Sequence, residues 1–381
     1  MYTKIFEKID SIESEYLRFL DKVCNIESPT SNKAAVDKVG VCFTGVAKRL
    51  SWEIEVLKQE VAGDAICITM NPDSDKAPIC LSGHIDTVHP LGLFGYPPVT
   101  RDGEKTYGPG VKDCKGGVVA ALMAMEALEK CGFKSRPVRL LIQSDEETGS
   151  STSGKATINY ICEMAKGAIA FLNLEGQSGN TAVIKRKGIL RYNFEVSGKA
   201  AHSSICYKGA NAVCEAAHKI IRLEALKDPD GLTCNCGVIH GGTAPNSVAD
   251  KCSFTADIRF SNHEEMERGI KILEEVASTS EIEGCTCTLQ RISLRPAMPL
   301  CERNVALLER MNEIYAECGL PILEGKSTMS GSDAAYITEC GIPCVDSIGT
   351  NGDRIHSKDE FIYTRSLAEA AKRIAAVVYG I

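Results

Sequence analysis

The chain has 381 residues and a formal net charge of −7, and this length suffices for about two domains with a full-sized core. The acidic balance argues against nucleic acid as the main partner. No stretch reaches the roughly 18 apolar residues of a membrane span, so we expect no membrane partner. The first residues enter an acidic amphipathic helix pattern without the apolar core of a secretory signal, so we expect a cytoplasmic protein.

The first half of the chain alternates strand and helix signals, which predicts an α/β sheet with helices on both faces. Apolar runs predict strands, and apolar residues at helical spacing predict helices. The expected strands lie at 65–70, 77–81, 138–143 and 168–174, and the expected helices at 116–130 and near 154–165.

The pattern changes near Lys187, where apolar and polar residues begin to alternate. We expect strands at 189–196, 235–240, 247–260 and 285–293, with helices at 209–226 and 264–278. This order is that of a small ferredoxin-like α+β unit. After Pro296 come helices at 303–317 and 364–378 and a short strand near 343–346. We therefore predict a discontinuous α/β domain, residues 1–187 and 294–381, with an α+β domain inserted at 188–293.

Residues of the kind that bind metals follow the expected strands of the α/β part, where open α/β sheets place their sites. His84 and Asp86 follow the run 79–83, the acidic triplet 145–147 follows 138–142, and Glu175 follows 168–172. A Gly/Pro loop at 107–113 ends in Asp113 just before a helix, and His356 lies in the polar turn 352–357.

The acidic triplet Asp145-Glu146-Glu147 requires a cation, because desolvating an unpaired carboxylate costs on the order of several kcal/mol. No Lys/Arg cluster lies beside it in sequence, so a metal is the better candidate. Two histidines with several carboxylates suit zinc, and more than four such groups indicate two ions, about 3.5–4 Å apart, that share one carboxylate. Asp86 can accept the second N–H of the His84 ring. In an extended segment, Glu146 and Glu147 would face opposite ways.

The chain resembles the co-catalytic dizinc peptidases that include carboxypeptidase G, succinyl-diaminopimelate desuccinylase, acetylornithine deacetylase, aminoacylase and peptidase T. The resemblance covers essentially the whole chain, and its motifs are specific. Tyr107-Gly108-Pro109-Gly110 and Arg186-Lys187-Gly188 are most similar to the carboxypeptidase G branch. The matching stretches are 83–88, 107–117, 145–150, 198–203, Asn246 within 241–250, 257–259, 330–333 and 356–357.

The resemblance implies a zinc-peptidase-like catalytic domain with a mixed sheet flanked by helices, and an inserted ferredoxin-like lid and dimerisation domain. It implies that Asp113 bridges two Zn²⁺ ions, for which Co²⁺ or Mn²⁺ could substitute. His84 and Glu175 would complete one site, and Glu147 and His356 the other. A non-proline cis peptide is expected after the bridging residue, at Asp113-Cys114. In strand-like geometry the Cys114 side chain would point away from that of Asp113.

The resemblance also implies roles for the remaining motif residues. Glu146 would be the general base and Asp86 the partner of His84. His202, from its own or a partner subunit, would stabilise the oxyanion. Arg259 would hold a substrate carboxylate, with a plain salt bridge as its alternative, and Asn246 and Gly331 would line the pocket. His89 is expected near the site without being a ligand.

These observations predict a homodimeric metal-dependent hydrolase that cleaves the amide bond next to a free-carboxylate amino acid in a small peptide or N-acyl amino acid. An N-acyl amino acid deacylase is the alternative. A catalytically silent metal-binding or interaction protein is the alternative from another class, although five ligands together with Glu146 speak against it. Gly176 and Ala249 stand where many relatives have proline, which concerns loop stiffness. The 18 scattered cysteines include no CxxC pair, so we expect reduced, small apolar residues.

Overall fold

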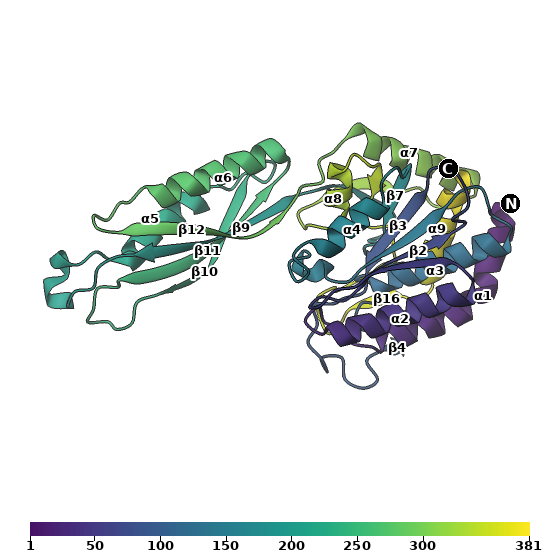
Figure 1. Ribbon diagram of the computed structural model, residues 1–381, viewed down its shortest axis with the longest axis horizontal. Coiled ribbons are helices and arrows are strands. Elements are labelled where there is room, and N and C mark those ends of the chain that lie inside the picture. Colours follow the sequence, from purple (N-terminus) through teal and green to yellow (C-terminus); the bar gives the residue numbers. More distant parts are fainter. The chain divides into compact units, whose positions relative to one another are not determined.

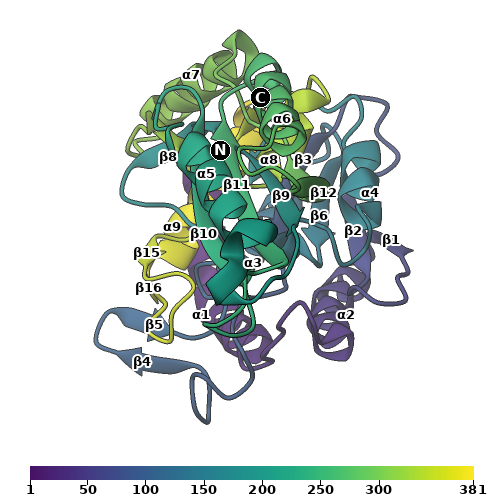
Figure 2. The ribbon, with the colours of Figure 1, turned by 90° about the vertical axis from the view of Figure 1, so that its left-hand side faces the viewer.

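The protein is described here by a computed structural model of residues 1–381 (Figures 1 and 2). The chain divides into two compact units. Unit 1 comprises Met1–Ile184, Leu300–Ser327 and Ser332–Ile381, and unit 2 comprises Lys185–Pro299 with Thr328–Gly331. The expected insert at 188–293 falls inside unit 2. The short piece Thr328–Gly331 is distant in sequence from the rest of unit 2, so sequence order alone could not assign it.

Unit 1 is built on a six-stranded mixed sheet with the order β1-β2-β6-β3-β7-β14. Its strands are β1 (Glu53–Leu57), β2 (Ala65–Met70), β3 (Ile79–His84), β6 (Val138–Gln143), β7 (Ala170–Asn173) and β14 (Cys344–Val345). The strands β6, β3, β7 and β14 run parallel, whereas β1 and β2 are antiparallel to their neighbours. β2 and β3 are buried along their whole length, as their continuous apolar runs predict.

Helices cover both faces of this sheet, so the predicted α/β class is confirmed. Alternate residues of β6 show the two faces: Leu140 and Ile142 belong to the core that includes α1, α2, α3 and α9, whereas Leu141 points to the face that α4 covers together with α8. The helices are α1 (Tyr2–Cys24), α2 (Lys33–Arg49), α3 (Lys115–Lys130), α4 (Ala156–Met164), α7 (Glu302–Glu317), α8 (Ala334–Glu339) and α9 (Ser366–Gly380).

A smaller antiparallel sheet in unit 1 has the order β15-β16-β5-β4. It consists of β4 (Thr100–Asp102), β5 (Lys105–Tyr107), β15 (Gly352–Asp353) and β16 (Phe361–Tyr363). Tyr107 pairs with Phe361, so the loop that follows β5 lies beside the turn that precedes β16. Two further strands, β8 (Thr181–Arg186) and β13 (Glu324–Thr328), pair with each other where the chain passes between the units.

Unit 2 is a four-stranded antiparallel sheet with two helices on one face, as the ferredoxin-like expectation requires. Its order is β10-β11-β9-β12. The inward residues Leu190, Phe194 and Val196 of β9 form a core with α5 and α6, whereas the alternate residues of β9 are more exposed. The elements are β9 (Gly188–Ser197), α5 (Ala212–Glu224), β10 (Thr233–Gly241), β11 (Lys251–Phe260), α6 (His263–Ser278) and β12 (Thr286–Arg295).

No helix has both the length and the apolar character needed to cross a bilayer. All 18 cysteines are free. Cys24, Cys80 and Cys344 are fully buried, where a thiol packs as a small apolar side chain.

Candidate metal centre

The five side chains expected to bind metal converge at one end of the parallel strands of unit 1. Each is delivered by a different element. His84 ends β3, Asp113 ends the loop after β5, Glu147 lies in a 3₁₀ turn (Glu146–Thr148) after β6, Glu175 follows β7, and His356 lies in the turn between β15 and β16.

The two carboxylate oxygens of Asp113 face two different histidines. Oδ1 lies 3.1 Å from Nε2 of His84, and Oδ2 lies 3.0 Å from Nε2 of His356. Glu175 Oε2 lies 3.8 Å from His84 Nε2, and Glu147 Oε2 lies 3.4 Å from His356 Nε2. The structure thus forms two groups of potential ligands that share Asp113.

The charge balance of this cluster suits divalent cations. The ion pairs of Asp113, Glu147 and Glu175 are all with histidines. Burial raises the pKa of Glu147 to about 7 and that of Glu175 well above its usual value. Burial opposes ionisation of Asp113 too, but hydrogen bonds from His356 and His84 outweigh it and lower the Asp113 pKa. One buried and two partly buried carboxylates with two imidazoles form a donor set that fits two divalent ions such as zinc.

Asp86 is buried behind His84 and contacts more than the imidazole. His84 Nδ1 lies 3.0 Å from the main-chain carbonyl oxygen of Asp86 and 3.3 Å from its carboxylate. The same carboxylate accepts the main-chain N–H groups of Glu146 and Glu147, each at 3.2 Å, and the hydroxyl of Thr30 at 2.7 Å. Asp86 therefore orients His84 and also fixes the turn that carries both glutamates.

Glu146 and Glu147 were expected to face opposite ways along an extended segment. This expectation is wrong, because both residues lie in a 3₁₀ turn. Successive side chains in such a turn are separated by about a third of a rotation. Asp145 shapes this turn, since its carboxylate accepts the Thr157 hydroxyl at 2.5 Å and the main-chain N–H of Ser153 at 2.8 Å. Glu146 is buried in this turn directly before Glu147 and is not one of the five expected ligands.

The peptide bond Asp113-Cys114 is cis, as expected. Cys114 immediately precedes α3 and is not in strand-like geometry, so the condition on which its side chain was expected to point away from that of Asp113 is not met. Its buried Sγ accepts the main-chain N–H of His84 at 3.2 Å. It also lies within 4.8 Å of ligand atoms of His84 and Glu175. The thiol therefore forms part of the wall beside one of the two ligand groups.

The sequence did not identify Glu360, which is fully buried directly beside the Asp113 loop. It accepts main-chain N–H groups from that loop. The ring of His89 lies near it, with Nε2 3.5 Å from Glu360 Oε2. His89 is thus close to the site and outside the ligand set.

The remaining candidates, His202, Asn246, Arg259 and Gly331, belong to unit 2. His202 caps a short 3₁₀ helix (Ser203–Lys208). Its Nδ1 accepts the main-chain N–H of Ser204 at 3.3 Å and lies 2.9 Å from the Ser204 hydroxyl. Since a main-chain N–H can only donate, the neutral ring carries its proton on Nε2. The main-chain carbonyl oxygen of Asn246 accepts the main-chain N–H of Ser203 at 2.9 Å, which places Asn246 beside this histidine.

Arg259 forms a salt bridge, which the sequence analysis gave as the alternative to carboxylate binding. Its Nε donates to Asp257 at 2.7 Å, and Asp257 also accepts from Arg191 at 2.6 Å. Gly331 packs closely, because an added β-carbon would lie 2.7 Å from Cδ of Arg295 and 3.0 Å from Cδ1 of Ile189. Ile189 pairs with both Arg259 and Arg295 across the sheet, so these residues form one cluster in unit 2.

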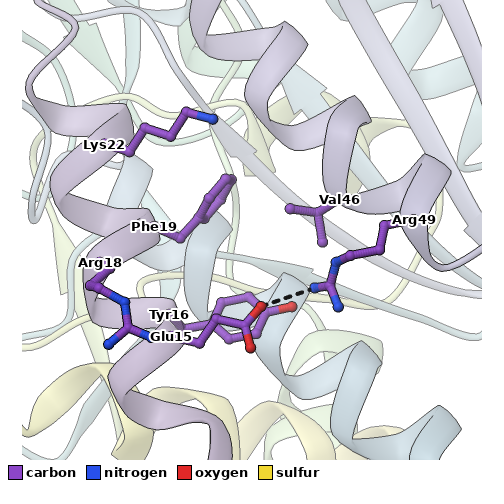
Figure 3. A pocket seen from close by; sticks show the side chains of 7 residues that line it. All are labelled: Glu15, Tyr16, Arg18, Phe19, Lys22, Val46 and Arg49. Carbon is purple, nitrogen blue, oxygen red and sulfur yellow. Dashed lines mark ion pairs between the residues drawn. The ribbon is translucent and has the colours of Figure 1, made fainter.

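A surface pocket lies between α1 and α2, where Phe19 and Val46 form its apolar part and Arg49 pairs with Glu15 (Figure 3). None of the candidate site residues lines it. Its ion pair lies on the surface, where such pairs contribute little to binding or stability.

Comparison with known proteins agrees with this geometry. The profile of peptidase family M20/M25/M40 matches residues 80–380. Carboxypeptidase G2 from Pseudomonas sp. (strain RS-16) is 27% identical over 366 residues, which are 94% of this chain and 87% of that protein.

Solved structures show the same fold. A tripeptidase from Staphylococcus aureus superposes with a TM-score of 0.78 at 22% identity and covers 96% of this chain and 97% of its own. A Bacillus subtilis protein described as a dinuclear metal-binding peptidase superposes with a TM-score of 0.72 at 15% identity, covering 98% and 100% of the two chains. The chain therefore belongs to peptidase family M20/M25/M40, a family of metallohydrolases in which dinuclear metal binding is typical.

Proposed function

We propose that this protein is a zinc-dependent exopeptidase of the carboxypeptidase type, which hydrolyses the amide bond next to an amino acid with a free carboxylate. The observation that carries the proposal is the position of Asp113, whose two oxygens face His84 and His356. Asp113 would bridge two Zn²⁺ ions, with Glu175 joining His84 and Glu147 joining His356. Similarity to carboxypeptidase G2 supports the choice of substrate.

The chemistry divides between the ions and the protein. The five side chains would hold two divalent ions, which would supply Lewis-acid polarisation of the scissile carbonyl and a lowered pKa for the attacking water. Glu146 would accept a proton from this water and return it to the departing amine. The turn held by Asp86 fixes the main chain of Glu146, from which the proposed base extends.

Residues of unit 2 would bind the substrate. His202 would donate a hydrogen bond from Nε2 to the developing oxyanion, in its own subunit or in a partner. Arg259, held by Asp257, would bind the free carboxylate through the remaining N–H groups of its guanidinium. Asn246 and Gly331 would line the pocket.

The proposal is tested with matched pairs of substrates. Small peptides and N-acyl amino acids should be cleaved, and the same compounds with an amidated carboxyl end should lose at least about tenfold in kcat/KM, because a charged hydrogen-bond pair is absent. Chelator should abolish the activity and added Zn²⁺ restore it. Equal cleavage of acids and amides would contradict the assigned role of Arg259.

The same experiment separates the alternatives. Preferential hydrolysis of N-acetyl or N-succinyl amino acids over peptides would favour a deacylase. Bound metal without hydrolysis of any amide would favour a silent metal-binding protein. A cytoplasmic homodimer formed through unit 2 completes the proposal, and sedimentation of the purified protein would show the mass of two chains.

A further inference from the structure

Glu360 is a buried carboxylate that none of the proposed catalytic steps uses. Its Oε1 accepts the main-chain N–H groups of Lys112 at 2.9 Å and Asp113 at 3.0 Å. Its Oε2 accepts the main-chain N–H of Gly110 at 3.3 Å. A buried main-chain N–H requires an acceptor, and here one side chain, fully shielded from solvent, serves three donors of a single loop.

The position of Glu360 in the small sheet explains why the loop needs it. The ladder between β5 and β16 ends at the pair Tyr107 and Phe361. Beyond this pair the 108–113 loop has no strand partner, and Glu360 immediately precedes Phe361. The Glu360 carbonyl oxygen accepts the N–H of Gly108 at 3.3 Å, and its carboxylate then binds the next part of the loop. Glu360 thus continues the pairing where the strands stop.

The surroundings of Glu360 hold the same two segments together. Nζ of Lys112 donates to the carbonyl oxygen of Gly352 at 2.9 Å, across the turn that carries His356. On the other side His89, only 4% exposed, packs edge-to-face on Phe94 with ring centroids 4.9 Å apart. His89 closes the space beside Glu360 Oε2. The loop that ends in Asp113 and the turn that presents His356 are therefore joined around this carboxylate.

We infer that Glu360 is a positioning residue of the metal centre, which fixes the main chain of Asp113 so that its two carboxylate oxygens face His84 and His356. This inference rests on the proposed function only in taking Asp113 as the bridging ligand. It predicts a graded effect, because Glu360→Gln keeps one carbonyl-type oxygen for the loop amides and Glu360→Met keeps none.

Zn²⁺ affinity, measured by competition with a chromophoric chelator, tests the inference without any substrate. The dissociation constant of the weaker-bound ion should rise about 10-fold in E360Q and about 100-fold in E360M, the range found when partners of metal ligands are removed. The visible spectrum of the Co²⁺-loaded protein should also change, because the geometry of the ligands around the ion changes. A purely structural role would lower the unfolding temperature and leave this spectrum unaltered.

Glu126→Gln is the matched control. Glu126 is equally buried in unit 1, but it accepts from Tyr16 and Arg49 and contacts no metal ligand. E126Q should bind Zn²⁺ as the wild type does. If E360M fails to fold, E360Q still decides. Wild-type affinity and an unchanged Co²⁺ spectrum in E360Q would overturn the inference, as would equal weakening in E126Q.

The outcome is separable from that of the proposed function. A wild-type protein that binds two ions but hydrolyses no amide would overturn the function, while the affinity comparison would still support or overturn the role of Glu360. A wild-type protein that binds no metal would overturn both.

Discussion

Gly176 and Lys112 share one space: a β-carbon on residue 176 would lie 2.4 Å from Cγ and 2.5 Å from Cε of Lys112. This contact accounts for the glycine at position 176, because a side chain here would displace Lys112. Lys112 in turn precedes Asp113 and binds Gly352.

Gly176→Ala should destabilise the protein by about 1–3 kcal/mol, the usual cost of overpacking a filled site. Thermal or denaturant unfolding measures this change. In the double variant G176A/K112A the displaced side chain is gone, so its destabilisation should be smaller than the sum of the two single changes. Additive effects would show that the two residues do not compete for this space.

Glu146→Gln should reduce kcat by at least about 10²-fold, since general acid–base catalysis contributes about 10²–10⁴-fold, while both ions remain bound. Glutamine preserves the size of the side chain, and the main chain of Glu146 stays held by Asp86. Steady-state kinetics with metal analysis of the same sample checks this. Turnover near that of the wild type would remove Glu146 from the role of base.

Ser204→Ala should lower kcat roughly fivefold with KM unchanged, because the loss of one hydrogen bond of about 1 kcal/mol loosens the orientation of His202. The main-chain N–H of Ser204 would remain as the only donor to Nδ1. Ser203→Ala is the matched control, since the contact of Ser203 with Asn246 uses its main chain. Equal kinetics in both variants would mean that the Ser204 hydroxyl does not orient the ring.

The metal-free protein should become less stable as the pH rises from about 5 to 9. Burial, opposed by a hydrogen bond from His356, raises the pKa of Glu147 to about 7. Hydrogen bonds to Asp113 and Glu147 raise the pKa of His356 to about 10. Because both values exceed those of the unfolded chain, the folded protein holds these protons more tightly. The resulting stabilisation is present at low pH and is lost as the pH rises through each raised value.

Bound metal should reverse this pH dependence, because the ions must displace the protons of Glu147 and His356. Thermal unfolding at about pH 6 and pH 9, with chelator and with saturating Zn²⁺, compares the two states. An unfolding temperature that rises with pH in the metal-free protein would contradict the assigned ionisation of the site.

The sequence predicted those parts of the site whose elements have a clear pattern. β3, β6 and β7 are short apolar runs that are buried in the structure, so the polar residues that follow them could be placed at one sheet edge. α2 was not predicted, although Val36, Val39, Phe43 and Ala47 are spaced as a buried helix face. The strands β5, β15 and β16 have only two or three residues, which is too short for a detectable period.

Other parts could not be read from the sequence because they depend on contacts distant along the chain. Glu360 accepts the N–H of Asp113 across 247 residues, and main-chain donors leave no trace in side-chain identity. The contact of Cys114 Sγ with the main-chain N–H of His84 spans 30 residues, and the 3₁₀ turn at Glu146–Thr148 is held by the carboxylate of Asp86.

The order of the expected ligands along the chain means that bound metal would link two distant segments of the chain. Four of the five precede unit 2, and His356 follows it. Ions bound by both groups of ligands would therefore cross-link two segments of the chain that unit 2 separates in sequence. In theory, cross-links that close long loops stabilise a protein the most. A chain cut within unit 2 would keep its two pieces joined through the pairing of β14 with β7 and of β16 with β5, and bound ions would strengthen that association.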